Sequence, residues 1–294
     1  MKTKLLYVCT LLLTMLLSFG FGIHTHAANF PEPEAPGINV STTANSEIDY
    51  SNIRYGYVKV RYNGTANVRV VLTAPNGTQY QYRINNNNNW EVIPLSEGNG
   101  RYQIGLFEQV SGNRFAVVDR IDVTVTLENE FAPFLRPNQF VNFNRNSRVV
   151  TLADEVTRGS TSVVDSVGRI FQYVVDNIEY DFELARTVQS GYVPNLDQVL
   201  QRRRGICFDY AALMTAMTRS QGIPTKLVIG YVGDVFHAWI SVYSEDTGWI
   251  EDIIFFDGNE WRIMDPTFAA TANQSAEVMR FIGDGQNHNP THFH

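Results

Sequence analysis

Residues 203–214 have the sequence Arg203-Arg204-Gly205-Ile206-Cys207-Phe208-Asp209-Tyr210-Ala211-Ala212-Leu213-Met214. A glycine-containing break precedes Cys207, and an apolar segment follows it from Ala211 to about Ser220. Gly222 and Pro224 then occupy the positions expected of helix stop signals. The pattern therefore predicts a helix with the cysteine in its first turn. A thiol there meets unpaired backbone N–H groups and the positive end of the helix dipole, and both favour the nucleophilic thiolate.

Two further residues can complete a nucleophilic site with Cys207. His237 lies thirty residues further along the chain, and Asp265 follows after another twenty-eight. A histidine can accept the thiol proton, and a carboxylate can orient the imidazole, which are the roles of a catalytic triad. Each residue also has an ordinary structural interpretation. Cys207 can be a buried apolar residue, His237 a hydrogen-bonded strand residue, and Asp265 a turn residue before Pro266.

The first 28 residues have the features of a secretory signal. Two lysines precede a mostly apolar run from Leu5 to Ile23, and the small residues Ala27 and Ala28 follow. We therefore expect cleavage there and a protein that is secreted, either extracellular or associated with the cell wall, without stable membrane insertion. The alternative is a single membrane anchor, because the run of 19 residues is long enough to span a bilayer. Its internal Thr, Ser and Gly residues favour cleavage.

Composition limits the partners of the mature chain. Cleavage changes the net charge from −7 to −9, with 21 basic and 30 acidic residues, and leaves Cys207 as the only cysteine. An exported chain with one cysteine has no internal disulfide. An acidic surface gives no electrostatic reason to bind nucleic acid, so none is expected. No phosphate loop, nucleotide fingerprint or heme motif occurs, so no cofactor is expected, and the sequence indicates no particular oligomeric state.

Residues 29–128 are expected to contain a leader and an all-β domain. Residues 29–37, rich in Pro and Glu, predict an extended and poorly ordered leader. Residues 38–128 alternate between apolar and polar side chains, as half-buried strands do. The alternating segments are 57–62, 68–70, 80–84, 101–106 and 121–127. Six or seven short strands predict a β-sandwich of immunoglobulin-like or fibronectin-like type. It has no cysteine, histidine or carboxylate cluster, so we expect a spacer or binding module.

The remaining chain is expected to form a linker, 129–150, an α+β domain, 151–284, and a tail, 285–294. The linker aromatics should pack between the domains. Capping boxes are predicted at Thr151 with Asp154 and at Ser162 with Asp165. Helices are predicted at 163–177 and from Asn195, strands at 226–231 and 238–243, and a hairpin at 253–256 with 261–264. Helices followed by strands predict an α+β core with an antiparallel sheet, which places Cys207 on a helix and both His237 and Asp265 on strands.

The tail contains three of the six histidines, His288, His292 and His294. No cysteine or ordered acidic partner accompanies them, so we expect a disordered end and no metal site.

Five segments, in this order, resemble the transglutaminase-like (papain-related) superfamily. They are Gly205-Ile206-Cys207-Phe208-Asp209-Tyr210-Ala211, Gly222-Ile223-Pro224, Gly230-Tyr231, His237-Ala238-Trp239 and Asp265-Pro266-Thr267. The resemblance covers roughly residues 160–270. The whole chain resembles secreted proteins of Gram-positive bacteria with a β-rich N-terminal domain and a transglutaminase-like, papain-like C-terminal domain. It implies that Cys207 is the nucleophile, His237 the general base and then acid, and Asp265 the residue that orients the imidazole.

The resemblance implies acyl transfer from a peptide or amide bond through a thioester. A hydrolase similar to a protease or amidase is the favoured prediction, and a protein-crosslinking transglutaminase is the alternative within the same chemistry. A further alternative is a non-catalytic cell-wall or protein-binding module with a vestigial triad. The expected substrate is a protein or peptide, including cell-wall peptides. The backbone N–H of Cys207 is a natural oxyanion donor. Candidates for a second donor or for substrate contacts are Tyr192, Asn195, Tyr231 and Trp239.

Overall fold

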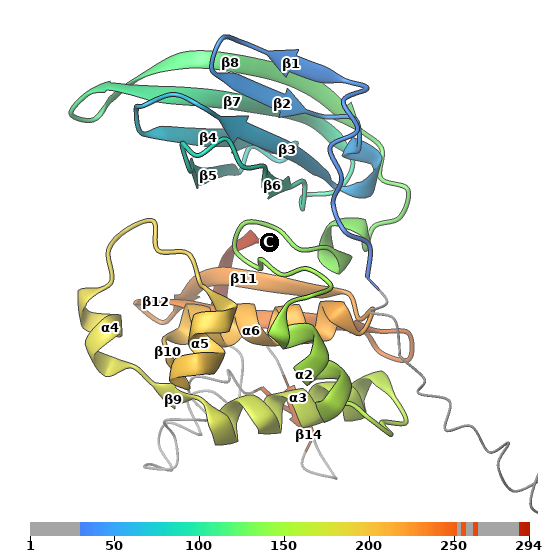
Figure 1. Ribbon diagram of the computed structural model, residues 1–294. Coiled ribbons are helices and arrows are strands. Elements are labelled where there is room, and N and C mark those ends of the chain that lie inside the picture. Colours follow the sequence, from blue (N-terminus) through green and yellow to red (C-terminus); the bar gives the residue numbers. More distant parts are fainter. Residues whose placement is uncertain (1–29, 252–253, 257–260, 264–287) are drawn as a thin grey trace, which may run out of the picture.

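The computed structural model describes residues 30–251, 254–256, 261–263 and 288–294 (Figure 1). The predicted signal sequence and Asp265 lie outside these residues. Two units lie one above the other in Figure 1, a β-rich unit and a unit of helices packed on a sheet. Among the described helices, none combines the length and the apolar character needed to cross a membrane.

The β-rich unit, which we call the β-domain, consists of two four-stranded antiparallel sheets. The first has the order β1 (Val40–Thr42), β2 (Ser46–Asp49), β3 (Tyr57–Tyr62) and β6 (Glu91–Pro94). The second has the order β5 (Gln79–Ile84), β4 (Val68–Thr73), β7 (Gly100–Ser111) and β8 (Arg114–Val125). A short 3-10 helix, η1 (Ile53–Tyr55), precedes β3. Alternate residues of both sheets, such as Val58 and Val70, share one buried core.

The predicted β-rich N-terminal region is therefore confirmed. It contains eight strands, one more than the upper estimate of seven, and β1, β2 and β6 are only three or four residues long. Such short strands show too few alternations for the pattern to be read from the sequence. The immunoglobulin-like or fibronectin-like type of the sandwich stays a prediction.

The proline-rich leader is extended but packed, which corrects the expectation of poor order. Phe30 is buried against Phe143, with ring centroids 4.7 Å apart. Lys59 Nζ donates a hydrogen bond to the carbonyl oxygen of Pro33 at 3.1 Å, and the Glu34 N–H donates to the Tyr57 hydroxyl at 3.0 Å. Proline restricts the backbone in the unfolded chain as well, so such a segment loses little conformational entropy when it docks.

The second unit has a four-stranded antiparallel sheet in the order β13 (Gly248–Ile250), β12 (Val235–Ser244), β11 (Thr225–Val232) and β16 (His288–Phe293). The helices are α2 (Arg148–Val156), α3 (Val163–Asn177), α4 (Phe182–Thr187), α5 (Leu196–Arg202) and α6 (Cys207–Ser220). A parallel pair joins β9 (Glu179–Tyr180) to β10 (Arg204–Gly205), and the predicted hairpin is β14 (Ile254–Phe256) with β15 (Trp261–Ile263). The predicted helices with an antiparallel sheet are confirmed.

Helix α6 is the centre of this unit. Every residue from Asp209 to Ser220 is buried, because the sheet strands β11 and β12 pack on one side and α2, α3 and α5 on the other. A helix that is buried all round needs apolar or internally bonded residues on every face. The run from Tyr210 to Met217 meets that requirement, with Thr215 bonding back to the Ala211 carbonyl at 2.8 Å.

One of the two predicted helix caps is confirmed and the other is wrong. Ser162 caps α3, and its side chain accepts a hydrogen bond from the Asp165 N–H at 3.1 Å. Thr151 lies inside α2, which already begins after Ser147. The reason is burial, since Val149 and Val150 face the core and extend the helix toward the N-terminus.

The predicted disordered tail is an ordered strand, which is a correction. Residues 288–293 form β16 on the free edge of β11, and His294 and Leu227 exchange backbone hydrogen bonds of 2.8 and 2.9 Å. Phe293 packs on Val228 and Trp239. The second unit therefore extends to His294. The histidines and Pro290 made the segment look like a polar tail. It forms a strand because the unpaired edge of β11 provides backbone hydrogen-bond partners, which almost any extended segment can use.

The end of β16 also joins the two units (Figure 1). His294 is buried among the rings of Tyr80, Tyr82 and Phe140, with centroid distances of 5.3, 5.7 and 4.6 Å. Its Nδ1 lies 3.1 Å from the Tyr82 hydroxyl. In the linker, the 3-10 helix η2 (Ala132–Leu135) brings Phe134 onto Trp249 of the second unit. Phe140 packs between Tyr82 of β5 and Phe208 of α6, as expected of linker aromatics.

Acidification should weaken this contact. Burial holds the pKa of His294 well below 6.5, and the nearby His292 and Arg219 act in the same direction. Below about pH 6.5 the unfolded chain takes up a proton at His294 and the folded chain does not, so the free energy of unfolding should fall as pH decreases. Urea unfolding at about pH 7.5 and about pH 5 measures this. His294→Phe should lose less stability between these pH values than the wild type, and an equal loss would contradict the assignment.

Candidate active site

Cys207 is the first residue of α6, and it is half-buried. Two hydrogen bonds fix the first helical turn around it. The buried Asp209 accepts the backbone N–H of Ile206 at Oδ2, 2.8 Å away, and the hydroxyl of Tyr192 at Oδ1, 2.7 Å away. Burial raises the pKa of Asp209, and these two donors act against that rise by stabilising the carboxylate. The carboxylate thus ties α6 to the loop before α5.

Gly205 allows this arrangement because it leaves room for Asp209. A Cβ atom at position 205 would lie 2.6 Å from the Cβ of Asp209, a distance that two carbon atoms cannot adopt without movement of the backbone. Gly205 also pairs with Tyr180 in the short parallel ladder. The Gly-x-Cys part of the sequence motif therefore has a packing explanation in addition to a chemical one.

Tyr192 and Asn195, two predicted oxyanion candidates, both make structural hydrogen bonds. Burial raises the pKa of Tyr192, and its bond to Asp209 adds to the rise, so the hydroxyl stays protonated and donates. Asn195 is the N-cap of α5, where its side-chain oxygen accepts the Gln198 N–H at 3.0 Å. Any role of these residues as oxyanion donors stays a prediction. The hydrogen bond from Tyr192 to Asp209, which positions the start of α6, is present in the structure.

His237 lies near the beginning of β12 and is buried, with 5% of its surface exposed. It pairs with Gly230 of β11. Side chains alternate along a strand, and Ala238, Ile240 and Val242 belong to the core that includes α6. His237 therefore lies on the other face of β12, together with Trp239.

The topology brings Cys207 and His237 to the same end of the helix–sheet layer, although His237 lies on the face of β12 that is directed away from α6. Arg219, at the end of α6, donates hydrogen bonds of 2.9 and 2.7 Å to the carbonyl of Thr225, where β11 begins. The chain turns between them, so β11 runs back along α6. From Arg219 to Cys207 the helix rises by about 18 Å. From Thr225 to Gly230, the partner of His237, the strand extends by about 17 Å. Because these two lengths are nearly equal, Gly230 and His237 lie at the same level along the layer as Cys207.

The two predicted aromatic residues of the site have different environments. Trp239 is 1% exposed, packs on Val228, and meets the ring of His288 at a centroid distance of 5.1 Å. Tyr231 is 41% exposed and pairs with the exposed Phe236, with ring centroids 5.6 Å apart. Tyr231 thus offers an aromatic surface to solvent at the end of the layer that holds His237. Asp265 lies outside the described residues.

The hydrogen bond between Asp209 and Tyr192 is not indicated by the sequence. The three-residue spacing from Ile206 to Asp209, typical of a capping box, is the signal that could have indicated the first bond. No group of three or more His, Cys, Asp or Glu side chains within the described part of the chain is arranged to hold a metal ion.

Comparison with known proteins identifies the unit that carries these residues. Residues 150–252 match the transglutaminase-like superfamily, and this range includes both Cys207 and His237. These residues form a transglutaminase-like domain. The match ends before Asp265, so it does not extend to the third residue of the predicted triad.

Individual proteins similar to this chain are distant. The uncharacterized protein YebA of Bacillus subtilis (strain 168) is 25% identical over 187 residues, which cover 56% of this chain and 25% of that protein. The chain thus spans about a quarter of the length of this curated relative. A candidate cysteine protease from Cytophaga hutchinsonii is 15% identical, with a TM-score of 0.41 over 87% of this chain and 74% of that one. Red sea bream transglutaminase is 14% identical, with a TM-score of 0.30 over 72% and 48% of the two chains.

Proposed function

We propose that the transglutaminase-like domain is a cysteine-dependent acyl-transfer enzyme that hydrolyses peptide or amide bonds, and that the protein carrying it is exported. The observation that supports this most is the placement of Cys207. Its half-buried thiol lies at the start of the buried helix α6, in a turn held by Asp209 and Tyr192. A thiol in the first helical turn is close to unpaired backbone N–H groups, which suits a nucleophile.

In the proposed reaction His237 accepts the proton of the Cys207 thiol, and the thiolate adds to the substrate carbonyl carbon. The backbone N–H of Cys207 stabilises the oxyanion. The C–N bond then breaks as His237 returns the proton to the leaving amine, and a thioester remains. Water attacks the thioester with its proton going to His237, and the C–S bond breaks to release the carboxylic acid and restore the thiol. Asp265 is proposed to orient the imidazole of His237.

Alkylation of Cys207 tests the proposal without knowledge of the substrate. We expect iodoacetamide to alkylate Cys207 rapidly at neutral pH, because the proposed pair with His237 activates the thiol. At neutral pH, His237→Ala should react at least about tenfold more slowly. Cys207→Ala should not react at all, and near-ultraviolet circular dichroism verifies that both variants are folded. The proposal would be contradicted if Cys207 were alkylated at the rate of an ordinary thiol and if His237→Ala left that rate unchanged.

The fate of the acyl group distinguishes hydrolysis from crosslinking. With a glutamine-containing peptide and a primary amine such as cadaverine, a hydrolase releases ammonia or cleaves the peptide without incorporating the amine. Incorporation of cadaverine that is lost in Cys207→Ala would instead support a crosslinking enzyme. Activity that survives Cys207→Ala would contradict both.

A further inference from the structure

Residues 138–141, which we call the linker turn, are closed by hydrogen bonds of their own. The side-chain oxygen of Asn138 accepts the backbone N–H groups of Phe140 and Val141, both at 3.0 Å, and the Asn138 N–H donates to the Val141 carbonyl at 3.1 Å. The Val141 side chain is fully buried in the core around α6. The backbone that carries Phe140 is therefore fixed on both sides of this residue.

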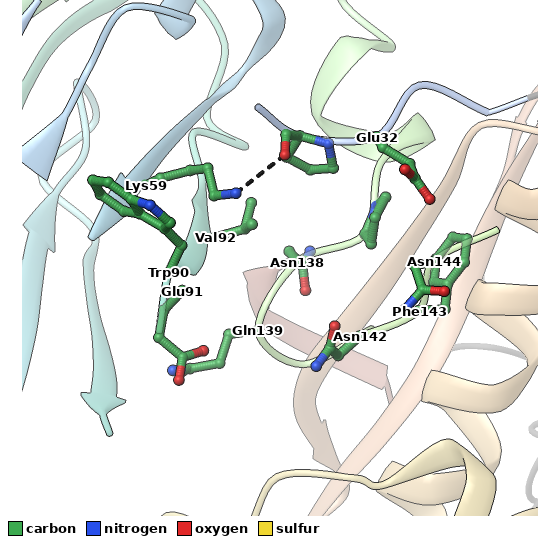
Figure 2. A pocket seen from close by; sticks show the side chains of 12 residues that line it. Glu32, Lys59, Trp90, Glu91, Val92, Asn138, Gln139, Asn142, Phe143 and Asn144 are labelled. Atoms are coloured by element: carbon green, nitrogen blue, oxygen red, sulfur yellow. Dashed lines mark hydrogen bonds between the residues drawn. The ribbon is translucent and has the colours of Figure 1, made fainter. Parts of the chain in front are cut away.

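The linker turn is also bonded to the β-domain. Gln139 donates its backbone N–H to the Val92 carbonyl at 3.0 Å and its side-chain amide to the Arg83 carbonyl at 2.6 Å. Figure 2 shows Gln139 beside Glu91 of β6, where the turn borders a cavity between the β-domain and the linker. Val92 belongs to β6 and Arg83 to β5, so strands from both sheets of the β-domain fix the position of the turn.

The Phe140 ring connects the β-domain core to the residue that follows Cys207. It packs on Tyr82 of β5 at a centroid distance of 5.3 Å and on Phe208 at 5.4 Å. Phe140 lies at the edge of the β-domain core, and Phe208 lies at the edge of the core around α6. Adjacent side chains on a helix are about 100° apart, so a fixed Phe208 ring also fixes the direction of the Cys207 side chain.

A second contact from the β-domain reaches the loop that supports the start of α6. Tyr192 of this loop donates to Asp209 at 2.7 Å, and its ring lies 6.5 Å from the Phe208 ring. The preceding residue, Gly191, has a φ of +88°, and a Cβ atom there would lie 2.6 Å from Cδ of Arg83. The Arg83 side chain therefore packs directly on the Gly191 backbone, next to the residue that bonds Asp209.

We propose that Phe140 and Arg83 are positioning residues of the active site. Through them the β-domain fixes the first turn of α6, and with it the direction of the Cys207 thiol. The first turn of a helix has unpaired N–H groups and frays easily, so contacts from outside the helix decide how firmly its first residue is placed. This inference rests on the proposed function, because the positioned group is the proposed nucleophile. It gives the β-domain a role beyond that of a spacer or binding module.

The first test measures how strongly Cys207 alkylation depends on His237 in the full mature chain. The rate with iodoacetamide at neutral pH is compared with and without His237→Ala, in the wild type and in Phe140→Ala. The proposed function predicts a wild-type ratio of at least about tenfold. Phe140→Ala should lower this ratio at least about threefold, because the thiol is no longer fixed in one direction relative to the histidine.

Phe131→Ala is the matched control for Phe140→Ala. Phe131 is also a half-buried aromatic residue of the linker, and it packs on Tyr243 and Trp249 at centroid distances of 4.2 and 6.0 Å. Tyr243 lies six residues beyond His237 on β12, which is about 20 Å along the strand. Phe131→Ala should therefore lower the urea midpoint as Phe140→Ala does, but it should leave the alkylation ratio at the wild-type value.

Hydrogen exchange gives a second readout, which does not depend on the chemistry of Cys207. Phe140→Ala should raise the exchange rates of backbone amides in 204–210 at least about fivefold, and Arg83→Ala should do the same in 189–193. Gln81→Ala is the control for Arg83→Ala, because Gln81 is exposed on the same face of β5, two residues away. It should leave the exchange of both segments unchanged.

Several results would overturn the proposal. Phe140→Ala keeps the wild-type alkylation ratio, or Phe131→Ala lowers that ratio equally, or Phe140→Ala leaves the exchange of 204–210 unchanged. Unchanged exchange of 189–193 in Arg83→Ala would contradict the role of Arg83. If wild-type alkylation does not depend on His237, the proposed function fails, and hydrogen exchange alone decides whether the β-domain fixes the turn. Phe140→Leu, which removes the ring but keeps an apolar side chain, replaces Phe140→Ala if urea unfolding shows that the alanine variant is not folded.

Discussion

Arg219→Met is expected to lower the free energy of unfolding by about 3–5 kcal/mol. The guanidinium of Arg219 is fully buried and donates four hydrogen bonds, all to backbone carbonyls. They are two to Thr225, one to Arg136 at 2.6 Å and one to His294 at 2.6 Å. These carbonyls belong to β11, the linker and the end of β16, so one side chain joins three segments to the end of α6. Methionine keeps much of the volume, and the loss therefore reports the hydrogen bonds.

The charge of Arg219 is maintained despite its burial. Burial lowers its pKa to about 9, so the group is still protonated at neutral pH. Arg219→Lys keeps a charge but not the planar fork, and it should lose most of the same stability. Arg169→Met is the matched control, because Arg169 is an exposed arginine that bonds Asp165 in α3 and the carbonyls of Arg158 and Gly159 in the preceding turn. It should cost less than about 1 kcal/mol. Urea unfolding measures all three, and a loss for Arg219→Met as small as for Arg169→Met would contradict this role.

The sequence predicted the elements whose pattern is local. Helix α3, the helix that follows Asn195, and the central strands β11 and β12 each have a clear period and a recognisable start or end. The sequence predicts a poorly ordered leader and a disordered tail, because the partners of both segments are distant in sequence. Phe30 packs on Phe143 and β16 pairs with β11, and neither contact leaves a periodic signal. Arg219 likewise resembles an ordinary charged residue at a helix end until its acceptors are known.

The candidate site likewise has some features that a local sequence pattern predicts and others that depend on contacts between residues distant in sequence. Cys207 could be located because a glycine break, a cysteine and an apolar helix are adjacent in the sequence. The support of Asp209 by Tyr192 could not, because it joins residues seventeen apart across a loop. The position of His237 along the layer follows from strand register, which the alternation of β12 alone does not provide.

Gly230→Ala is expected to destabilise the transglutaminase-like domain by about 1–3 kcal/mol. Gly230 lies between two strands of the sheet, paired with His237 on β12 and with Pro290 on β16. A Cβ atom there would overlap the carbonyl oxygen of Asn289 and come within 2.7 Å of Cη2 of Trp239. The backbone oxygen cannot rotate away as a side chain can, so β16 must shift from β11 or the indole must leave its packed position.

Hydrogen exchange and urea unfolding together separate these responses. Movement of β16 should raise the exchange rates of backbone amides in 288–293 more than those in β12, because only β16 would lose its partner strand. Gly168→Ala is the matched control, since Gly168 lies inside α3 with no atom within 4 Å of an added Cβ. It should stabilise the protein by about 0.5–1 kcal/mol, as alanine does in a helix interior. A Gly230→Ala variant as stable as the wild type, with β16 amides still protected, would mean that the close approach of Asn289 to Gly230 is not required for β16 to dock.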